Sequence, residues 1–268
     1  MSQTIQRFSR DHRQLTLVGA LVLSSLLALG LHFVRIARTG TNTYPFFPWD
    51  LFLAWLPMLA ALAAYNLYRR KLSRRGWVVV IVLAAIWLLF MPNAPYLVTE
   101  FVNLRRGFFG GQFGGGQFNG GPLNGTPQPG APRVGGDGSP FGAPAANGLP
   151  GWYDILLFVT FAWTGVFLGV ASLFLMQQVV REIRGKMAGW LFALIALALT
   201  SFGIYLGRFV RLNSWDVILN PLRLARSVAF SALRPDTYLF TAVFAFFIIS
   251  TYLMLMALMN FRADRAES

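Results

Sequence analysis

The sequence predicts an all-α membrane protein, a polytopic helix bundle with about six transmembrane helices. Its composition is 56% apolar and only 12% charged, whereas charged residues make up about a quarter of an ordinary soluble domain. Apolar runs close to the roughly 20 residues of a spanning helix recur along the 268-residue chain. The basic residues lie between these runs. The three observations together favour repeated crossing of a membrane.

All the expected spans except the third have the length that a spanning helix needs. They are predicted within a single membrane domain 1–268, at about residues 15–34, 49–68, 76–91, 152–180, 187–208 and 237–260. The third covers about 24 Å at 1.5 Å per residue, less than the roughly 30 Å hydrocarbon core. We therefore expect a break near the end of that helix.

The first apolar run follows Arg7, Arg10 and Arg13, which is also the pattern of a cleaved signal peptide. The segment Ala28-Leu29-Gly30 is a weak match to a cleavage site. The run continues through Val34, however, and is longer than the apolar region of a typical signal peptide. We expect a retained first helix.

The charge distribution predicts the partners and the orientation. The net charge is +13, but the basic residues form no stripe with stacking aromatics, so we expect membrane lipids and no nucleic acid as partners. Five basic residues crowd the short segment Arg69–Arg75, which is a positive-inside signal. The sequence thus predicts an integral membrane protein with both termini in the cytoplasm.

Two outward-facing connections have distinct characters. Residues 108–150 are dominated by Gly and Pro and show no apolar periodicity, which predicts a disordered outer loop. Residues 216–233 are predicted to form an amphipathic helix lying at the interface, with its arginines towards lipid headgroups.

The break is expected at Pro92–Pro95, because proline cannot continue the helical hydrogen-bond ladder. Asn93 is a suitable N-cap for a short new helix. One face of that helix then carries the four polar residues Tyr96, Thr99, Glu100 and Asn103, by their i, i+3, i+4, i+7 spacing. Two interpretations stay open: the polar face lies in water at the interface, or it turns into the bundle.

Further polar residues gather at the same outer level of the predicted bundle. The binding candidates are Asn93, Tyr96, Thr99, Asn103, Tyr153, Tyr205, Arg208, Arg211, Asn213, Ser214 and Asp216. The catalytic candidates are Glu100 and Asp154, and Arg208 could neutralise either of them. Asp154, like Asp50, Asp216 and Asp236, stands near a helix N-terminus, where capping is an alternative explanation. Capping does not explain Glu100.

Several functional classes find no support in the sequence. There is no cysteine, so there are no disulfides, thiolate metal sites or cysteine nucleophiles. The histidines His12 and His32 are isolated, and we predict no metal and no cofactor. The pairs Gly165/Gly169 and Gly203/Gly207 have the spacing of close helix packing in membranes.

Three motifs give the chain a family resemblance. They are Asn93-Ala94-Pro95-Tyr96 with Thr99-Glu100; Trp152-Tyr153-Asp154; and Gly203-Ile204-Tyr205-Leu206-Gly207-Arg208-Phe209 continuing to Arg211 and Asn213-Ser214-Trp215-Asp216. The segment Leu51–Pro57 fits as well. The chain resembles, from its second span to its sixth, the bacterial integral membrane proteins grouped as domain of unknown function 1361. The resemblance implies a multi-pass protein integral to the bacterial cytoplasmic (inner) membrane and no established activity.

Two departures from the family pattern matter. The family often has Asp at the position of Glu100 and His at the position of Asn103, which disfavours histidine-based proton transfer or metal binding here. The loop 108–150 is also longer than the resemblance implies, so we do not expect it to carry a shared function.

Three functions stay open for the outer polar cluster, so the sequence does not decide whether the protein is an enzyme. The first is action on a lipid-linked or anionic substrate, with Glu100 or Asp154 as general acid or base and Arg208 and Arg211 holding the anionic group. The second is a small transporter or lipid-binding protein that uses the break as a discontinuous helix. The third is a structural or assembly subunit whose polar groups lock the bundle.

Overall fold

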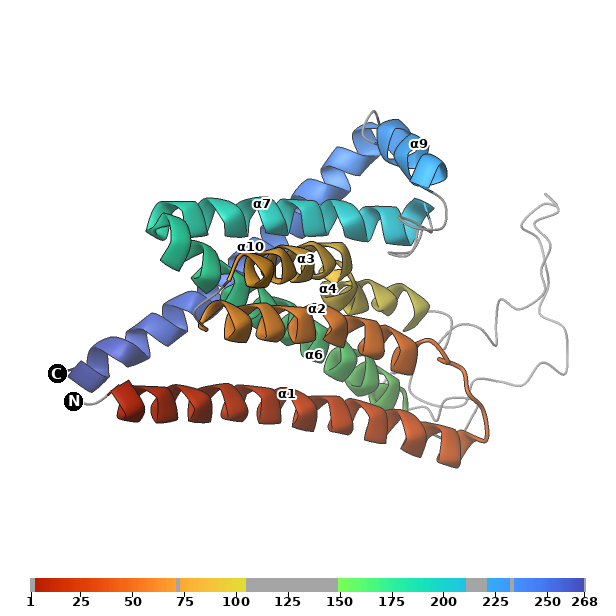
Figure 1. Cartoon of the computed structure of the whole chain (residues 1–268). Coiled ribbons are helices and arrows are strands. Elements are labelled where there is room, and N and C mark those ends of the chain that lie inside the picture. Colours follow the sequence, from red (N-terminus) through yellow and green to blue (C-terminus); the bar gives the residue numbers. More distant parts are fainter. Residues whose placement is uncertain (1–2, 71–72, 105–148, 211–220, 232–233, 268) are drawn as a thin grey trace, which may run out of the picture. The chain divides into compact units, whose positions relative to one another are not determined.

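The computed structural model is all-α and has no strand in its described part, which confirms the expected fold class (Figure 1). The structure describes the backbone of residues 3–70, 73–104, 149–210, 221–231 and 234–267. Side chains are described between residues 14 and 258 of these ranges, except at 223 and 236. Nearly all of the predicted loop 108–150 therefore lies outside the described residues. So do four binding candidates: Arg211, Asn213, Ser214 and Asp216.

The described part of the chain is built from helical elements. They are α1 (Gln3–Thr39), α2 (Phe47–Tyr68), α3 (Arg74–Phe90), α4 (Asn93–Tyr96), η1 (Leu97–Glu100), α6 (Gly151–Arg184), α7 (Lys186–Tyr205), the π-helical turn η2 (Leu206–Val210), α9 (Pro221–Ser231) and α10 (Pro235–Glu267).

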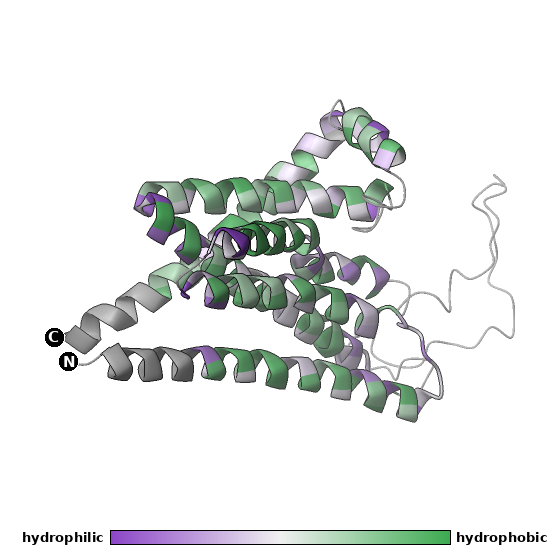
Figure 2. Cartoon of the chain, viewed as in Figure 1, coloured by the Kyte–Doolittle hydropathy of each residue, from purple (hydrophilic) through white to green (hydrophobic). Residues whose placement is uncertain are grey.

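Six segments of the described chain are long and apolar enough to cross a membrane. They are Gln14–Thr39, Phe47–Tyr68, Arg74–Leu104, Gly151–Arg184, Lys186–Val210 and Thr237–Leu258. Hydrophobic residues dominate these helices in Figure 2. The protein is therefore a multi-pass integral membrane protein.

The third and the first of these segments extend furthest beyond the expected ranges. The third expected span ends at residue 91, but helical structure resumes after the break and brings the segment to Leu104. The first expected span ends at residue 34, whereas α1 continues to Thr39. Gly40 follows with φ +65° and donates its N–H to the carbonyl of Ile36 at 2.8 Å. This left-handed glycine ends the helix, because a residue with a Cβ rarely adopts that conformation.

Backbone packing divides the chain into two compact units. One unit holds Met1–Phe47 and Glu100–Phe161, and the other holds Pro48–Thr99 and Ala162–Ser268. Each unit is described by itself below. The single membrane domain expected from the sequence stays a prediction.

Aromatic side chains build the core of the first unit. Phe47 is fully buried and stacks on Phe161, with ring centroids 4.2 Å apart. Phe158 meets the rings of Phe47 and Tyr44 edge-on, at 4.8 and 4.9 Å. Such pairs add favourable contact energy beyond the area that they bury. The start of α6 is thus packed against the segment that leads into α2.

The core of the second unit centres on Trp87 of α3, which is 1% exposed. Its indole N–H donates to the Ser172 hydroxyl of α6 at 3.1 Å, and its ring stacks on Phe192 of α7 at 5.5 Å. Tyr252 of α10 donates to the Gln177 side chain of α6. These hydrogen bonds give the buried polar groups the partners that water would otherwise provide.

The helix α9 lies within residues 216–233, where the sequence predicts an amphipathic helix. It contacts η2. Its Leu222 and Phe230 are 74% and 65% exposed. These apolar side chains suit a helix at a lipid interface, and that interfacial placement stays a prediction.

Candidate functional site

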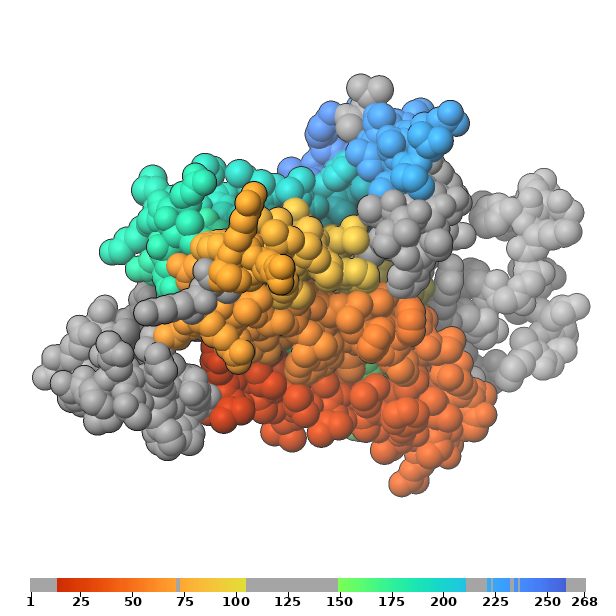
Figure 3. All heavy atoms as spheres, in the orientation of Figure 1, coloured from red at the N-terminus to blue at the C-terminus, as the bar shows by residue number. Residues whose placement is uncertain are grey.

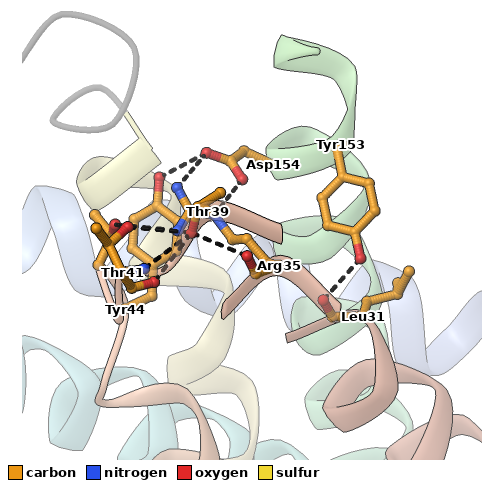
Figure 4. Close-up of polar contacts among 8 residues, drawn as sticks. Leu31, Arg35, Thr39, Thr41, Tyr44, Tyr153 and Asp154 are labelled. Carbon is orange, nitrogen blue, oxygen red and sulfur yellow. Dashed lines mark hydrogen bonds and ion pairs between the residues drawn. The ribbon is translucent and has the colours of Figure 1, made fainter. Parts of the chain in front are cut away.

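A buried ion pair holds the catalytic candidate Asp154 (Figure 4). The Arg35 guanidinium of α1 donates from Nε to Oδ1 at 2.7 Å and from Nη2 to Oδ2 at 3.2 Å. Arg35 is 4% exposed and Asp154 6%. Two parallel charge-assisted bonds make this the strong, bidentate form of the pair.

Tyr44 completes the surroundings of this carboxylate. Its hydroxyl donates to Asp154 Oδ2 at 3.1 Å, and the Arg35 guanidinium lies 4.6 Å from the centre of its ring. Arg35 also donates to the Thr43 hydroxyl at 3.0 Å. Burial, and then the neighbouring Asp154 carboxylate, raises the pKa of the Tyr44 phenol above its usual value. The phenol therefore remains a protonated donor at physiological pH.

Tyr153 binds to α1 one helical turn before Arg35. Its hydroxyl donates to the carbonyl of Leu31 at 2.8 Å, and Leu31 lies four residues before Arg35. Residues i and i+4 share one helix face. The adjacent residues Tyr153 and Asp154 thus both bind to one turn of α1. We call the four residues Arg35, Tyr44, Tyr153 and Asp154 the α1 clamp.

The structure gives Asp154 a partner that sequence reasoning missed. Asp154 lies in the first turn of α6, as expected, but its carboxylate is bound to Arg35 and Tyr44. The expected first span ends at residue 34 and therefore leaves Arg35 outside the helix, whereas α1 continues to Thr39. Gly40 is the sequence signal for this, since a glycine in the left-handed conformation marks the end of a helix and the helix that ends there includes Arg35.

The break in the second unit follows from the two missing proline N–H groups. Pro95 cannot donate to the carbonyl of Met91, which instead accepts from Ala94 N–H at 3.3 Å. That shift releases the carbonyl of Phe90, and the Asn93 amide donates to it at 3.1 Å. The expected N-cap role of Asn93 is therefore wrong: Pro92 holds the position before α4, and the Asn93 amide donates towards the preceding helix.

Three glycines pack against the break closely. A Cβ on Gly165 would lie 2.3 Å from the carbonyl oxygen of Ala94, and one on Gly203 would lie 2.5 Å from Pro92 Cγ. A Cβ on Gly169 would be at 3.4 Å from Ala94 and Pro95. Small residues let helices approach this closely in membranes. The break is thus packed against α6 and α7.

Two of the four polar residues after the break, Thr99 and Glu100, are buried, and the other two, Tyr96 and Asn103, are half-buried. Glu100 is 3% exposed and Thr99 9%, while Val102 is 65% exposed. Thr99 donates to the Tyr96 carbonyl at 2.7 Å. The Asn103 amide donates to Glu100 Oε2. Of the two interpretations left open by the sequence, this burial favours a polar face turned into the protein.

The remaining described candidates lie at the end of the fifth span. Tyr205 is the last residue of α7 and is 6% exposed, with its ring 4.9 Å from that of Phe209 and 5.8 Å from that of Phe240. Arg208 lies in η2, and π-helical turns are frequent at functional sites. Glu100 belongs to the first unit and Arg208 to the second, so their pairing stays a prediction.

His32, which stands isolated in the sequence, is a buried polar residue in the structure. It is 2% exposed, and its ring meets those of Phe33, Phe47 and Phe161 at 5.7 to 6.4 Å. Its Nδ1 has no hydrogen-bond partner within the described part of the chain. Among those same residues, no three His, Asp or Glu side chains are grouped to hold a metal ion.

Comparison with known proteins gives one match. A family model described as "Protein of unknown function (DUF1361)" matches residues 49–251. The matched region contains Glu100, Asp154 and Arg208, while Arg35 and Tyr44 of the α1 clamp precede it. The comparisons with curated proteins and with solved structures gave no match.

Proposed function

The chain belongs to the DUF1361 family of proteins of unknown function, and from that premise we propose that it acts on a lipid-linked or anionic substrate. The substrate meets the polar cluster at the extracytoplasmic ends of the helices. Glu100 exchanges a proton with it, and Arg208 with Arg211 holds its anionic group.

The different environments of two buried carboxylates support this proposal. Asp154 accepts hydrogen bonds from the Arg35 guanidinium at both carboxylate oxygens and a further one from the Tyr44 hydroxyl, so its oxygens are already bound within the protein. Glu100 accepts a hydrogen bond from the Asn103 amide. We therefore assign proton exchange to Glu100 and a structural role to Asp154.

A structural or assembly subunit is the second candidate, favoured by the α1 clamp. Its ion pair and tyrosine bonds account for two site candidates without any ligand. The transporter alternative is less well supported. A discontinuous transport helix lines a cavity, whereas this break packs so closely on Gly165 and Gly203 that neither position leaves room for a methyl group.

The Glu100→Gln variant separates the two candidates. It keeps the size of the side chain and removes the titratable group. We express each variant in cells from which the gene has been deleted. We expect the Glu100→Gln protein to accumulate to the wild-type level, while the lipid profile of the cells stays the same as in the deletion strain. Quantitative immunoblotting and lipid mass spectrometry measure the two effects.

The matched control is Asp154→Asn, which makes the same chemical change at the other buried carboxylate. Asp154→Asn is expected to lower the abundance of the protein, and to change the lipid profile only as much as that loss of protein explains. A normal lipid profile in Glu100→Gln cells at normal abundance would contradict the catalytic proposal. Parallel losses of abundance in both variants would support the structural candidate.

The proposed topology places the polar cluster outside the inner membrane. Because the native chain has no cysteine, single cysteines report orientation without background. We expect Asn42→Cys, between α1 and α2, to react with a membrane-impermeant maleimide in intact cells. Lys186→Cys, at the start of α7, is expected to react only after permeabilisation. The reverse pattern would invert the proposed orientation.

A further inference from the structure

A further group of polar residues lies near the start of α3, at the end of that helix opposite to the Pro92–Pro95 break. An open hollow of about 370 Å³ is lined by Tyr68, Arg69, Arg70, Trp77 and Glu182. Its residues come from the end of α2, the loop after it, the start of α3 and the end of α6, all within the second unit. The α2–α3 hairpin, coloured orange, faces the viewer in Figure 3.

The two arginines supply the chemistry for a phosphate. Arg69 Nη1 donates to the Tyr65 hydroxyl at 3.2 Å, and its guanidinium lies 5.6 Å from the centre of that ring. This contact orients one guanidinium beside the hollow. A planar guanidinium matches a phosphate in bidentate geometry.

The other lining residues suit an ammonium group. Glu182 offers a carboxylate, and the rings of Tyr68 and Trp77 meet edge-on at 5.9 Å. Aromatic faces and a carboxylate both attract a cation. A purely anionic headgroup would instead place its charge beside Glu182.

The position of the hollow near the ends of three membrane segments indicates that its ligand is a lipid. Tyr68 ends the second membrane segment, Arg74 begins the third and Arg184 ends the fourth. The hollow therefore lies at the level where segments leave the membrane. Trp and Tyr favour this level, and basic residues near it contact lipid headgroups.

We propose that this hollow binds the headgroup of phosphatidylethanolamine. Arg69 and Arg70 bind its phosphate, and Glu182 with Trp77 receives its ammonium group. The site is independent of the function proposed for Glu100, since it uses none of the same residues.

The test is native mass spectrometry of the full-length protein in detergent with equimolar phosphatidylethanolamine and phosphatidylglycerol. We expect preferential retention of phosphatidylethanolamine. Loss of two charge-assisted contacts in Arg69→Gln/Arg70→Gln should lower that retention about tenfold or more. Glu182→Gln should mainly abolish the preference between the two lipids.

The charge-matched control is Arg74→Gln/Arg75→Gln, in the same basic hairpin but outside the hollow. General attraction to a basic surface would make both double variants equally weak. The proposal is overturned if they lose lipid equally, or if the wild type retains phosphatidylglycerol at least as well. It is also overturned if Glu182→Gln keeps the wild-type preference.

Discussion

Asp154→Asn is expected to destabilise the protein by about 3–5 kcal/mol, the usual effect of removing one partner from a buried ion pair. Arg35 is 4% exposed, so its charge would remain buried without a counter-ion. The Tyr44 hydroxyl would also lose its carboxylate acceptor. Denaturant unfolding of the purified protein in detergent, monitored by tryptophan fluorescence, measures the change.

Two further variants show whether the loss comes from the unpaired charge. The double variant Arg35→Met/Asp154→Leu removes both charges and is expected to be more stable than Asp154→Asn, because apolar replacement of a whole buried pair is often neutral or stabilising. Glu182→Gln neutralises an exposed carboxylate of the same helix and is expected to unfold like the wild type. If Asp154→Asn unfolds like Glu182→Gln, the α1 clamp does not stabilise the fold.

Gly165→Ala is the second large effect that we expect. The added Cβ would lie 2.3 Å from the Ala94 carbonyl oxygen and 2.8 Å from Leu97 Cδ1. The first of these atoms is backbone, so the break or α6 must move to admit the methyl group. Overpacking of this kind costs about 1–3 kcal/mol or more, and the same unfolding experiment measures it.

The chain offers matched glycine controls for this substitution. A Cβ on Gly30 of α1 meets nothing within 4 Å, so Gly30→Ala is expected to be neutral or to stabilise by up to about 1 kcal/mol through helix propensity. Gly169→Ala, with its nearest neighbours at 3.4 Å, should fall between the two. Equal stability of Gly165→Ala and Gly30→Ala would show that the break is not packed as closely as the structure indicates.

Local features of the fold could be predicted because they depend on residues close in sequence. Prolines at 92 and 95 lack the N–H that continues a helix, so the break and the short α4 follow from the sequence. The spacing of Gly165 and Gly169 likewise predicted close packing. Their specific partners, Ala94 and Pro95, could not be predicted, since no sequence pattern shows which helix fills a groove.

The candidate site was predicted in part for the same reason. Glu100 stood out because capping does not explain a carboxylate at that position, and the structure buries it. For Asn93 the prediction failed, because a side-chain amide can either cap the next helix or bond to the previous one. The carbonyl released by Pro95 favours the second option.

The sequence by itself determined the number and class of the membrane segments, because apolar length and the absence of proline N–H groups act locally. Only the tertiary structure decided the pairing of polar groups. Arg35 and Asp154 lie 119 residues apart in the chain. Buried charges in a low-dielectric interior must find a counter-charge wherever packing brings one, and sequence distance places no limit on that choice.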